Sequence, residues 1–250
     1  MARLRFGAMV STAFLSMAPL GLGVALDSLA RPGVRTLQRW YRRWSGAILG
    51  AGGIRVHAIL RDDRILEDPV VLVANHQVAI DIPVAMQAVS LPFGFVAKSS
   101  VRRIPFLGMA TARSGNLFID RRHPRQALRD LDEAASTVRA GRSVLFFAEG
   151  TRSYAPILGA LRPGAFRLAL AAQVPLVPVA IRNSYRLADE RAFAAQPGTV
   201  EVVIGRPIPT AGRGRRDLPA LTDAVRDAIQ AELADEAARW AATYAGPSAS

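Results

Sequence analysis

The sequence predicts an α/β fold in which helices flank a mainly parallel central sheet, with a membrane-associated helical arm at the N-terminus. Short runs of Val, Leu and Ile alternate with longer segments of helical periodicity from residue 54 onward. These runs contain no regular polar positions, which is typical of strands buried on both faces of a parallel sheet. Half of the 250 residues are hydrophobic, so the chain can form one full-sized domain with a small appendage.

The N-terminal arm contains a stretch without charge, residues 6–26, that is long enough to cross a bilayer. Pro19, Gly21 and Gly23 interrupt it. A cleaved signal peptide is one interpretation, with Gly23 and Ala25 mimicking the small residues of a cleavage site. We favour a retained membrane segment, because an amphipathic helix follows it and no cysteine supports export.

That amphipathic helix is predicted from aromatic and aliphatic residues at helical spacing, with arginines between them: Leu37, Trp40, Tyr41, Trp44 and Ile48, with Arg35, Arg39, Arg42 and Arg43. Trp, Tyr and Arg together favour a helix lying in the lipid interface, and a helix packed on the domain is the alternative. Residues 1–61 carry nine arginines and one acid, whereas the rest of the chain holds 23 basic and 19 acidic residues. We therefore expect residues 1–50 to be a membrane anchor. Nucleic acid is not an expected partner, because no recognised binding module accompanies the arm.

The α/β domain is expected over residues 51–245, followed by a frayed tail at 246–250. Short apolar runs predict strands at 70–74, 93–97, 117–119, 143–147, 176–181 and 200–204. Helical periodicity predicts helices at 82–89, 124–140, 164–172 and 218–244.

Asn75, His76 and Asp81 follow the strand predicted at 70–74. His76 would emerge at the carboxyl end of a buried strand, where open α/β sheets collect their ligand sites. The carboxylate of Asp81 can orient one imidazole nitrogen while the other accepts a proton. The alternative is a capped helix beside a hydrogen-bonded histidine.

The end of the strand predicted at 143–147 carries groups suited to an anionic ligand. Gly150 permits a tight turn, while Thr151 and Arg152 can hold anionic oxygens. The alternative is an ordinary turn in which Glu149 pairs with Arg152.

Two more strand ends carry basic residues. Arg121 and Arg122 follow the strand at 117–119, and paired guanidinium groups suit bidentate recognition of phosphate. A solvated edge or an ion pair with Asp120 is the alternative. Lys98 is the one lysine among 32 basic residues, which suggests that a compact charge is needed there, although chance explains a single lysine equally well.

Several classes of function are excluded by what the sequence lacks. Without cysteine there is no disulfide, thiolate ligand or cysteine nucleophile, and the three histidines have no zinc-site spacing, so no metal is expected. No Gly-x-Ser-x-Gly elbow and no phosphate-loop lysine motif occurs, which argues against a serine hydrolase and a nucleotide triphosphate enzyme.

Four segments, in order, resemble the blocks of the glycerolipid acyltransferases, most closely the 1-acyl-sn-glycerol-3-phosphate (lysophosphatidic acid) acyltransferases. They are Asn75-His76-x4-Asp81, the segments 115–121 and 147–153, and Val174 to Val179, within a match over about residues 54–208. The resemblance implies a membrane-bound enzyme that moves a fatty acyl group from acyl-CoA or acyl carrier protein to the sn-2 hydroxyl of a lysophospholipid, without a cofactor. It also implies the cytoplasmic face of the inner membrane, with a monotopic or single-span arm.

Carried over to this sequence, the resemblance implies that His76 is the general base and Asp81 its orienting partner. Residues expected to bind substrate are Asn75, Lys98, Arg121, Glu149, Gly150, Thr151 and Arg152. Two positions depart from the family pattern: Ala148 stands where proline is usual, and Val78 where serine is common.

The chemistry of the residues agrees with this assignment. An alcohol needs a base as it attacks a thioester, and without a nucleophile of its own the chain favours direct transfer in a ternary complex. Another lysophospholipid or a lyso-aminolipid is the alternative acceptor. A basic membrane-binding protein without catalysis is the alternative class.

Overall fold

The computed structural model describes residues 1–30, 34–62, 69–98, 117–119 and 124–244. The described residues form a seven-stranded sheet of order β1-β9-β6-β2-β5-β3-β4, in which β6 and β9 pair antiparallel and the other neighbours are parallel. Its strands are β1 (Ile54–Leu60), β2 (Val71–Ala74), β3 (Phe93–Lys98), β4 (Leu117–Ile119), β5 (Ser143–Phe147), β6 (Leu176–Arg182) and β9 (Gly198–Ile204). A separate hairpin joins β7 (Ala188–Asp189) and β8 (Ala194–Ala195).

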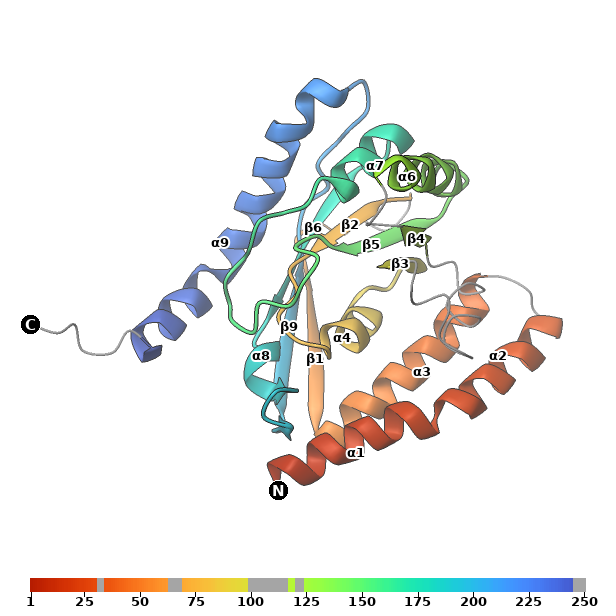
Figure 1. The fold of residues 1–250 in the computed structure, drawn as a ribbon. Coiled ribbons are helices and arrows are strands. Elements are labelled where there is room, and N and C mark those ends of the chain that lie inside the picture. The colour runs from red at the N-terminus through yellow and green to blue at the C-terminus, as the bar shows by residue number, and fades with distance from the viewer. Residues whose placement is uncertain (31–33, 63–68, 99–116, 120–123, 245–250) are drawn as a thin grey trace, which may run out of the picture.

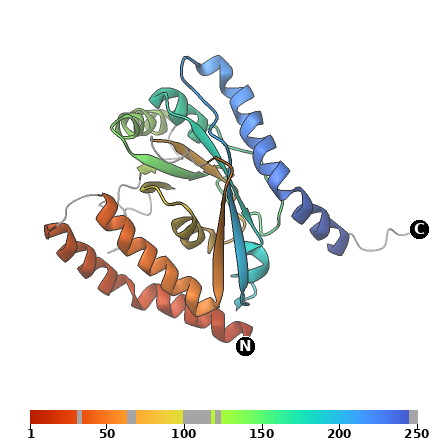
Figure 2. The same cartoon turned by 180° about the vertical axis from the view of Figure 1, so that it is seen from behind.

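Helices cover both faces of the sheet, so the mainly parallel α/β fold predicted from the sequence is confirmed. On one face lie α6 (Pro124–Arg139), α7 (Gly164–Ala172) and α9 (Leu218–Tyr244), and on the other lies α4 (Asp81–Ala88) with the N-terminal helices (Figures 1 and 2). A short helix, α8 (Ser184–Leu187), follows β6.

The central strand shows why its sequence is apolar throughout. Leu72 and Ala74 pack into the core beneath α4, while Val71 and Val73 pack into the core beneath α7, and all four side chains are fully buried. Alternating side chains therefore enter two different cores, and neither tolerates a polar group.

The N-terminal arm folds as α1 (Ala2–Leu15), α2 (Met17–Ala30) and α3 (Val34–Gly52), with α3 returning alongside the first two (Figure 1). The segment Ala2–Val24 is apolar and long enough to cross a membrane, a property that signal sequences share. Ile48 and Leu49 of α3 are buried, and Trp44 packs against the domain core. This side of α3 therefore packs on the domain, as the alternative interpretation of the sequence predicted.

Exposed apolar side chains belong mainly to α1 and α2. They are Leu4, Val10, Phe14, Leu15, Leu22 and Leu26, and Leu15 is 77% exposed. The exposed apolar surface of the arm therefore lies mainly on the two helices that precede α3.

The predicted strands and domain helices all form within a residue or two, but the sequence prediction missed β1, β7 and β8. β1 pairs with β9 alone among the described residues, and its burial alternates along the strand. Arg55 and His57 take two of its exposed positions, so it lacks the continuous apolar run of the central strands.

Candidate active site

The turn after β2, residues 75–80, lies at the centre of the sheet. β2 pairs with β5 on one side and β6 on the other, both in parallel register, so the carboxyl ends of three strands meet there. We call residues 75–80 the His76 turn. α4 begins directly after it, at Asp81.

His76 and Asp81 form a hydrogen-bonded pair. Nδ1 of His76 lies 2.8 Å from Oδ2 of Asp81, and the same oxygen accepts the backbone N–H groups of Gln77 at 2.5 Å and Val78 at 2.9 Å. Asp81 is fully buried, whereas the His76 side chain is 14% exposed. Since the carboxylate accepts the Nδ1 proton, Nε2 is the imidazole nitrogen that remains to accept a proton.

The alternative role for Asp81, a helix cap, does not fit its contacts. The backbone donors of Gln77 and Val78 precede α4, and α4 has no side-chain cap at its N-terminus. The ring of His76 is further fixed by stacking on Phe147, with centroids 4.1 Å apart. The His76 turn therefore presents one oriented imidazole, which is the geometry a general base needs.

Glu149 supports the turn from the end of β5. Its Oε1 accepts the backbone N–H of His76 at 2.9 Å, and its Oε2 accepts that of Gly159 at 2.8 Å. Burial raises the pKa of this carboxyl group, and the two backbone N–H bonds partly offset that rise. Both oxygens thus hold backbone groups of the protein, which gives Glu149 a positioning role, and its expected contact with the acceptor stays a prediction.

The neighbouring glycine has a conformation that other residues rarely adopt. Gly150 has φ +75°, and a Cβ there would lie 2.5 Å from the guanidinium Nε of Arg162. Arg162 in turn donates from Nε to the carbonyl oxygen of Glu149 at 3.1 Å. Gly150 therefore lets Arg162 pack over the loop.

Thr151 and Arg152 are exposed beside the His76 turn. Arg152 does not pair with Glu149, so that alternative is wrong: its Nη1 lies 2.5 Å from Oε1 of Glu190, on the β7–β8 hairpin. The backbone next to Arg152 is tied to the turn, since Ser153 N–H donates to the His76 carbonyl at 2.9 Å and Tyr154 N–H to the Gln77 carbonyl at 3.0 Å.

Asn75 anchors the first residue of the turn. Its side-chain amide exchanges two hydrogen bonds with the backbone of Ile181 in β6, at 2.9 and 2.7 Å, and it is 1% exposed. Its amide is thus committed to the fold, and nothing in the geometry supports its expected contact with substrate.

Two of the expected contacts cannot be placed. Arg121 lies outside the described residues, as do Arg122 and Asp120. Lys98 is the last residue of β3, and its side chain is outside the described part of the chain. The fourth block, residues 174–179, leads into β6 and supports the turn by strand packing.

The two departures from the family pattern have structural consequences. Ala148 donates its backbone N–H to the Ala74 carbonyl at 3.2 Å, a bond that proline cannot make. Val78 is 1% exposed and belongs to the core beneath α4.

Sequence reasoning missed three polar residues around the turn. Gln77 Oε1 accepts the hydroxyl of Ser184 at 2.8 Å, Glu236 of α9 accepts the Asn183 N–H at 2.6 Å, and Glu190 holds Arg152. No local pattern singles these residues out, because each acts on a partner more than 30 positions away.

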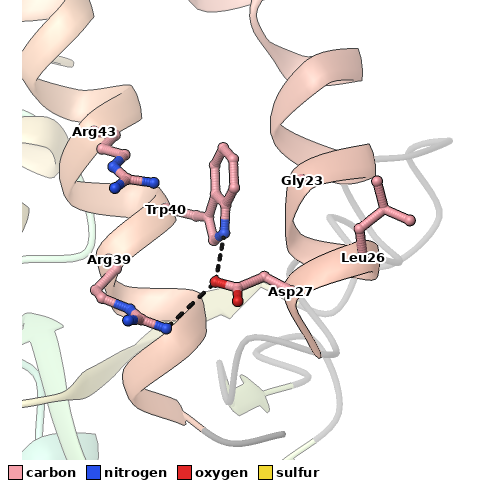
Figure 3. Close-up of a pocket in the computed structure, with 6 residues that line it drawn as sticks. All are labelled: Gly23, Leu26, Asp27, Arg39, Trp40 and Arg43. Atoms are coloured by element: carbon pink, nitrogen blue, oxygen red, sulfur yellow. Dashed lines mark hydrogen bonds and ion pairs between the residues drawn. The ribbon is translucent and has the colours of Figure 1, made fainter. Parts of the chain in front are cut away.

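A shallow pocket of about 470 Å³ lies in the N-terminal arm, between α2 and α3 (Figure 3). The Asp27 carboxylate accepts hydrogen bonds from Trp40 Nε1 at 3.2 Å and Arg39 Nη2 at 3.3 Å, and the Arg43 guanidinium lies 5.2 Å from the Trp40 ring. These contacts hold α2 against α3, and the pocket contains no residue of the His76 turn.

A mainly parallel α/β sheet that places an aspartate-oriented histidine at the end of its central strand has the geometry of a site for general-base chemistry. A family model described as Acyltransferase matches residues 54–182, just over half of the chain. The protein belongs to this acyltransferase family.

Individual relatives agree with the family assignment. The chain is 35% identical over 168 residues to an uncharacterized acyltransferase of Schizosaccharomyces pombe, covering 66% of this chain and 60% of that protein. It is 31% identical over 172 residues to the 1-acyl-sn-glycerol-3-phosphate acyltransferase of Saccharomyces cerevisiae, covering 68% and 57%. The human alpha form is 34% identical over 165 residues, covering 64% and 57%. The chain thus matches about three fifths of the length of these relatives.

A solved structure shares the fold over nearly the whole chain. The 1-acyl-sn-glycerophosphate (LPA) acyltransferase PlsC of Thermotoga maritima superposes with a TM-score of 0.77, at 22% identity, covering 95% of this chain and 96% of that one.

Proposed function

We propose that this protein transfers a fatty acyl group from an acyl thioester to the sn-2 hydroxyl of lysophosphatidic acid, giving phosphatidic acid. The observation that carries the proposal is the oriented pair of His76 and Asp81 at the end of the central strand. The names of the relatives from Saccharomyces cerevisiae and Homo sapiens support lysophosphatidic acid as the acceptor.

The reaction follows from the tautomer of His76. Nε2 removes the proton of the acceptor hydroxyl as its oxygen attacks the thioester carbonyl, which gives a tetrahedral intermediate. Collapse of that intermediate breaks the C–S bond, and the imidazolium returns its proton to the leaving thiolate. Asp81 stabilises the imidazolium between these two steps, so no acyl-enzyme is needed.

Arg152 and Arg121 would bind the phosphate of the acceptor, since guanidinium groups match phosphate geometry. The donor would be acyl-CoA or acyl carrier protein. The apolar surface of α1 and α2 would hold the domain on the cytoplasmic face of the inner membrane, where a lysophospholipid resides.

A second candidate keeps the chemistry but changes the acceptor to another lysophospholipid or a lyso-aminolipid. The ion pair of Arg152 with Glu190 favours it, because a neutralised arginine attracts a phosphomonoester less strongly.

The test is thiol release by the purified protein in mixed micelles, with acyl-CoA and acyl carrier protein donors offered separately. Each donor is combined with lysophosphatidate, other lysophospholipids and monoacylglycerol. We expect the highest kcat/KM with lysophosphatidate, and a loss of at least about a thousandfold in His76→Ala. Full activity in His76→Ala would exclude His76 as the general base. A higher kcat/KM with monoacylglycerol, which has no phosphate, would exclude lysophosphatidate as the preferred acceptor.

A further inference from the structure

Glu190 joins two parts of the candidate site that are distant in sequence. It follows β7 in the β7–β8 hairpin, and its Oε1 lies 2.5 Å from Arg152 Nη1 while its Oε2 accepts the Ala79 N–H at 3.3 Å. One carboxylate thus contacts both the arginine assigned to the acceptor phosphate and the backbone of the His76 turn.

The hairpin also lies against the N-terminal arm. α1 packs on β8, and the ring of Phe6 meets the ring of Phe193 edge-on with centroids 5.8 Å apart. Phe193 is 66% exposed. Glu190 is therefore carried by the element that links the arm, with its exposed apolar surface, to the site.

Among the described residues, the charged side chains on the β7–β8 hairpin and next to Arg152 form ion pairs. Arg152 pairs with Glu190, and Arg191, whose guanidinium lies 4.1 Å from the Tyr154 ring, pairs with Asp189 at 3.4 Å. A phosphomonoester that binds Arg152 therefore meets the negative charge of Glu190 at the same guanidinium group.

The Arg152–Glu190 pair is accessible enough to be exchanged. The side chains are 40% and 20% exposed, and ion pairs in such positions contribute little free energy. Among the described residues, Arg152 makes its hydrogen bond through Nη1, so its other nitrogens remain available to an anionic oxygen.

We propose that Glu190 is a specificity-determining residue that competes with the phosphate of the acceptor for Arg152. It weakens the binding of a doubly charged phosphomonoester more than that of a singly charged phosphodiester headgroup, and so broadens the range of lysolipids the site accepts. This inference rests on the proposed function, because it assumes that Arg152 receives the acceptor phosphate.

The test is Glu190→Gln, which keeps an oxygen for the Ala79 N–H but removes the charge. KM is measured in mixed micelles for three acceptors: lysophosphatidate, lysophosphatidylglycerol and monoacylglycerol. We expect KM for lysophosphatidate to fall about fivefold and KM for lysophosphatidylglycerol about twofold, with no change for monoacylglycerol. The kcat should stay the same for each acceptor. KM is the quantity compared between variants, because it does not depend on the fraction of the enzyme that is folded.

Two controls isolate the contact. Asp189→Asn removes an acid of the same hairpin that pairs with Arg191 instead of Arg152, and it should change KM for lysophosphatidate less than about twofold. In an Arg152→Ala background, Glu190→Gln should lower KM for lysophosphatidate much less, because the competition for the shared partner is gone and only direct repulsion remains.

A KM for lysophosphatidate that is unchanged or higher in Glu190→Gln overturns the inference. So does an equal fall in kcat for all three acceptors, since that result assigns Glu190 to the His76 turn alone. If the wild-type protein acylates lysophosphatidate normally, either result leaves the proposed function intact. If the wild-type protein acylates none of the three acceptors, the proposed function fails and this inference fails with it.

Discussion

Oε1 of Glu149 lies 2.9 Å from the backbone nitrogen of His76, so the acid at one strand end fixes the histidine at the next. The parallel register explains the contact: Ala74 of β2 lies opposite Phe147 of β5, and each functional residue follows two positions later. Glu149 of the third sequence block therefore holds the first block through the backbone of His76.

Replacing Glu149 with Gln should lower both activity and stability. An amide offers one acceptor oxygen, so its NH2 group would face either the His76 or the Gly159 N–H, and one buried donor would lose its partner. We expect a loss of about 1–3 kcal/mol in the free energy of unfolding in urea, together with a lower kcat. Glu133→Gln, on the exposed face of α6, is the matched control. Equal stability of the two variants would contradict the positioning role.

Gly159→Ala tests the same contact from the other side. A Cβ at residue 159 would lie 2.8 Å from Oε2 of Glu149, so the carboxylate must move and its hold on His76 weakens. We expect kcat to fall about tenfold or more, because a displaced base misses its reacting geometry. The control is Gly214→Ala, where a Cβ meets nothing within 4 Å and φ is −129°. A kcat equal to that of the control would show that the contact does not position His76.

The fold and the contact between His76 and Asp81 were predictable because their signals are local. β2 enters two cores and is apolar at every position, and His76 and Asp81 are five positions apart on one turn. The partner of Arg152 was not predictable, because Glu190 lies 38 positions away on a hairpin whose strands have two residues each. Strands that short carry no periodicity from which to place a side chain.

Buried polar residues were the second limit of the sequence prediction. Gln77 and Glu236 are 0% and 2% exposed, yet glutamine and glutamate in a sequence indicate surface positions. Their burial depends on Asn183 and Ser184, which bring donors to them from the far end of β6. Only the folded chain brings these segments together.

Glu236 should make stability depend on pH. Burial raises its pKa above the ordinary value of 4.5, with the hydrogen bond from Asn183 N–H opposing the rise. A carboxyl group with a raised pKa binds its proton more tightly in the folded state, so its contribution to stability is complete below pH 4.5 and is lost as pH rises through the folded pKa. Urea unfolding of the wild type and of Glu236→Gln between about pH 4 and 8 measures this.

The stability of the wild type relative to Glu236→Gln should therefore fall over that range and then level off. The matched control is Asp235→Asn, an exposed acid of the same helix, which should change the free energy of unfolding by less than about 0.5 kcal/mol. If the free energy of unfolding of the wild type relative to Glu236→Gln rises with pH instead, the folded protein stabilises the ionised carboxylate of Glu236, and the prediction is wrong.

The exposed side chains of α1 should govern membrane binding. Phe14 and Leu15 are 71% and 77% exposed, so Phe14→Ser with Leu15→Ser removes apolar surface without opening a cavity. We expect partitioning onto anionic vesicles to fall at least about tenfold in flotation assays, with unchanged thermal unfolding. The control, Leu60→Ser at the end of β1, is 37% exposed and should bind like the wild type. Undiminished vesicle binding by the double variant would exclude this surface as the anchor.

Substitutions of Asp81 can separate the contribution of its charge from the contribution of its hydrogen bonds. Its Oδ2 accepts three hydrogen bonds from the His76 turn, whereas Oδ1 has no partner among the described residues. In Asp81→Asn the amide oxygen can replace Oδ2 and the amide nitrogen can occupy the place of Oδ1, which keeps the His76 tautomer but removes the charge.

Asp81→Asn should therefore lose about a hundredfold to a thousandfold in kcat with little change in KM, because only the stabilisation of the imidazolium is missing. Asp81→Ala also releases Nδ1 and the backbone of the turn, so it should lose more activity than Asp81→Asn, and stability as well. Single-turnover thiol release and urea unfolding of the two variants make the comparison. Wild-type kcat in Asp81→Asn would mean that orientation alone is the contribution of Asp81, and equal losses in both variants would mean that its charge accounts for the whole effect.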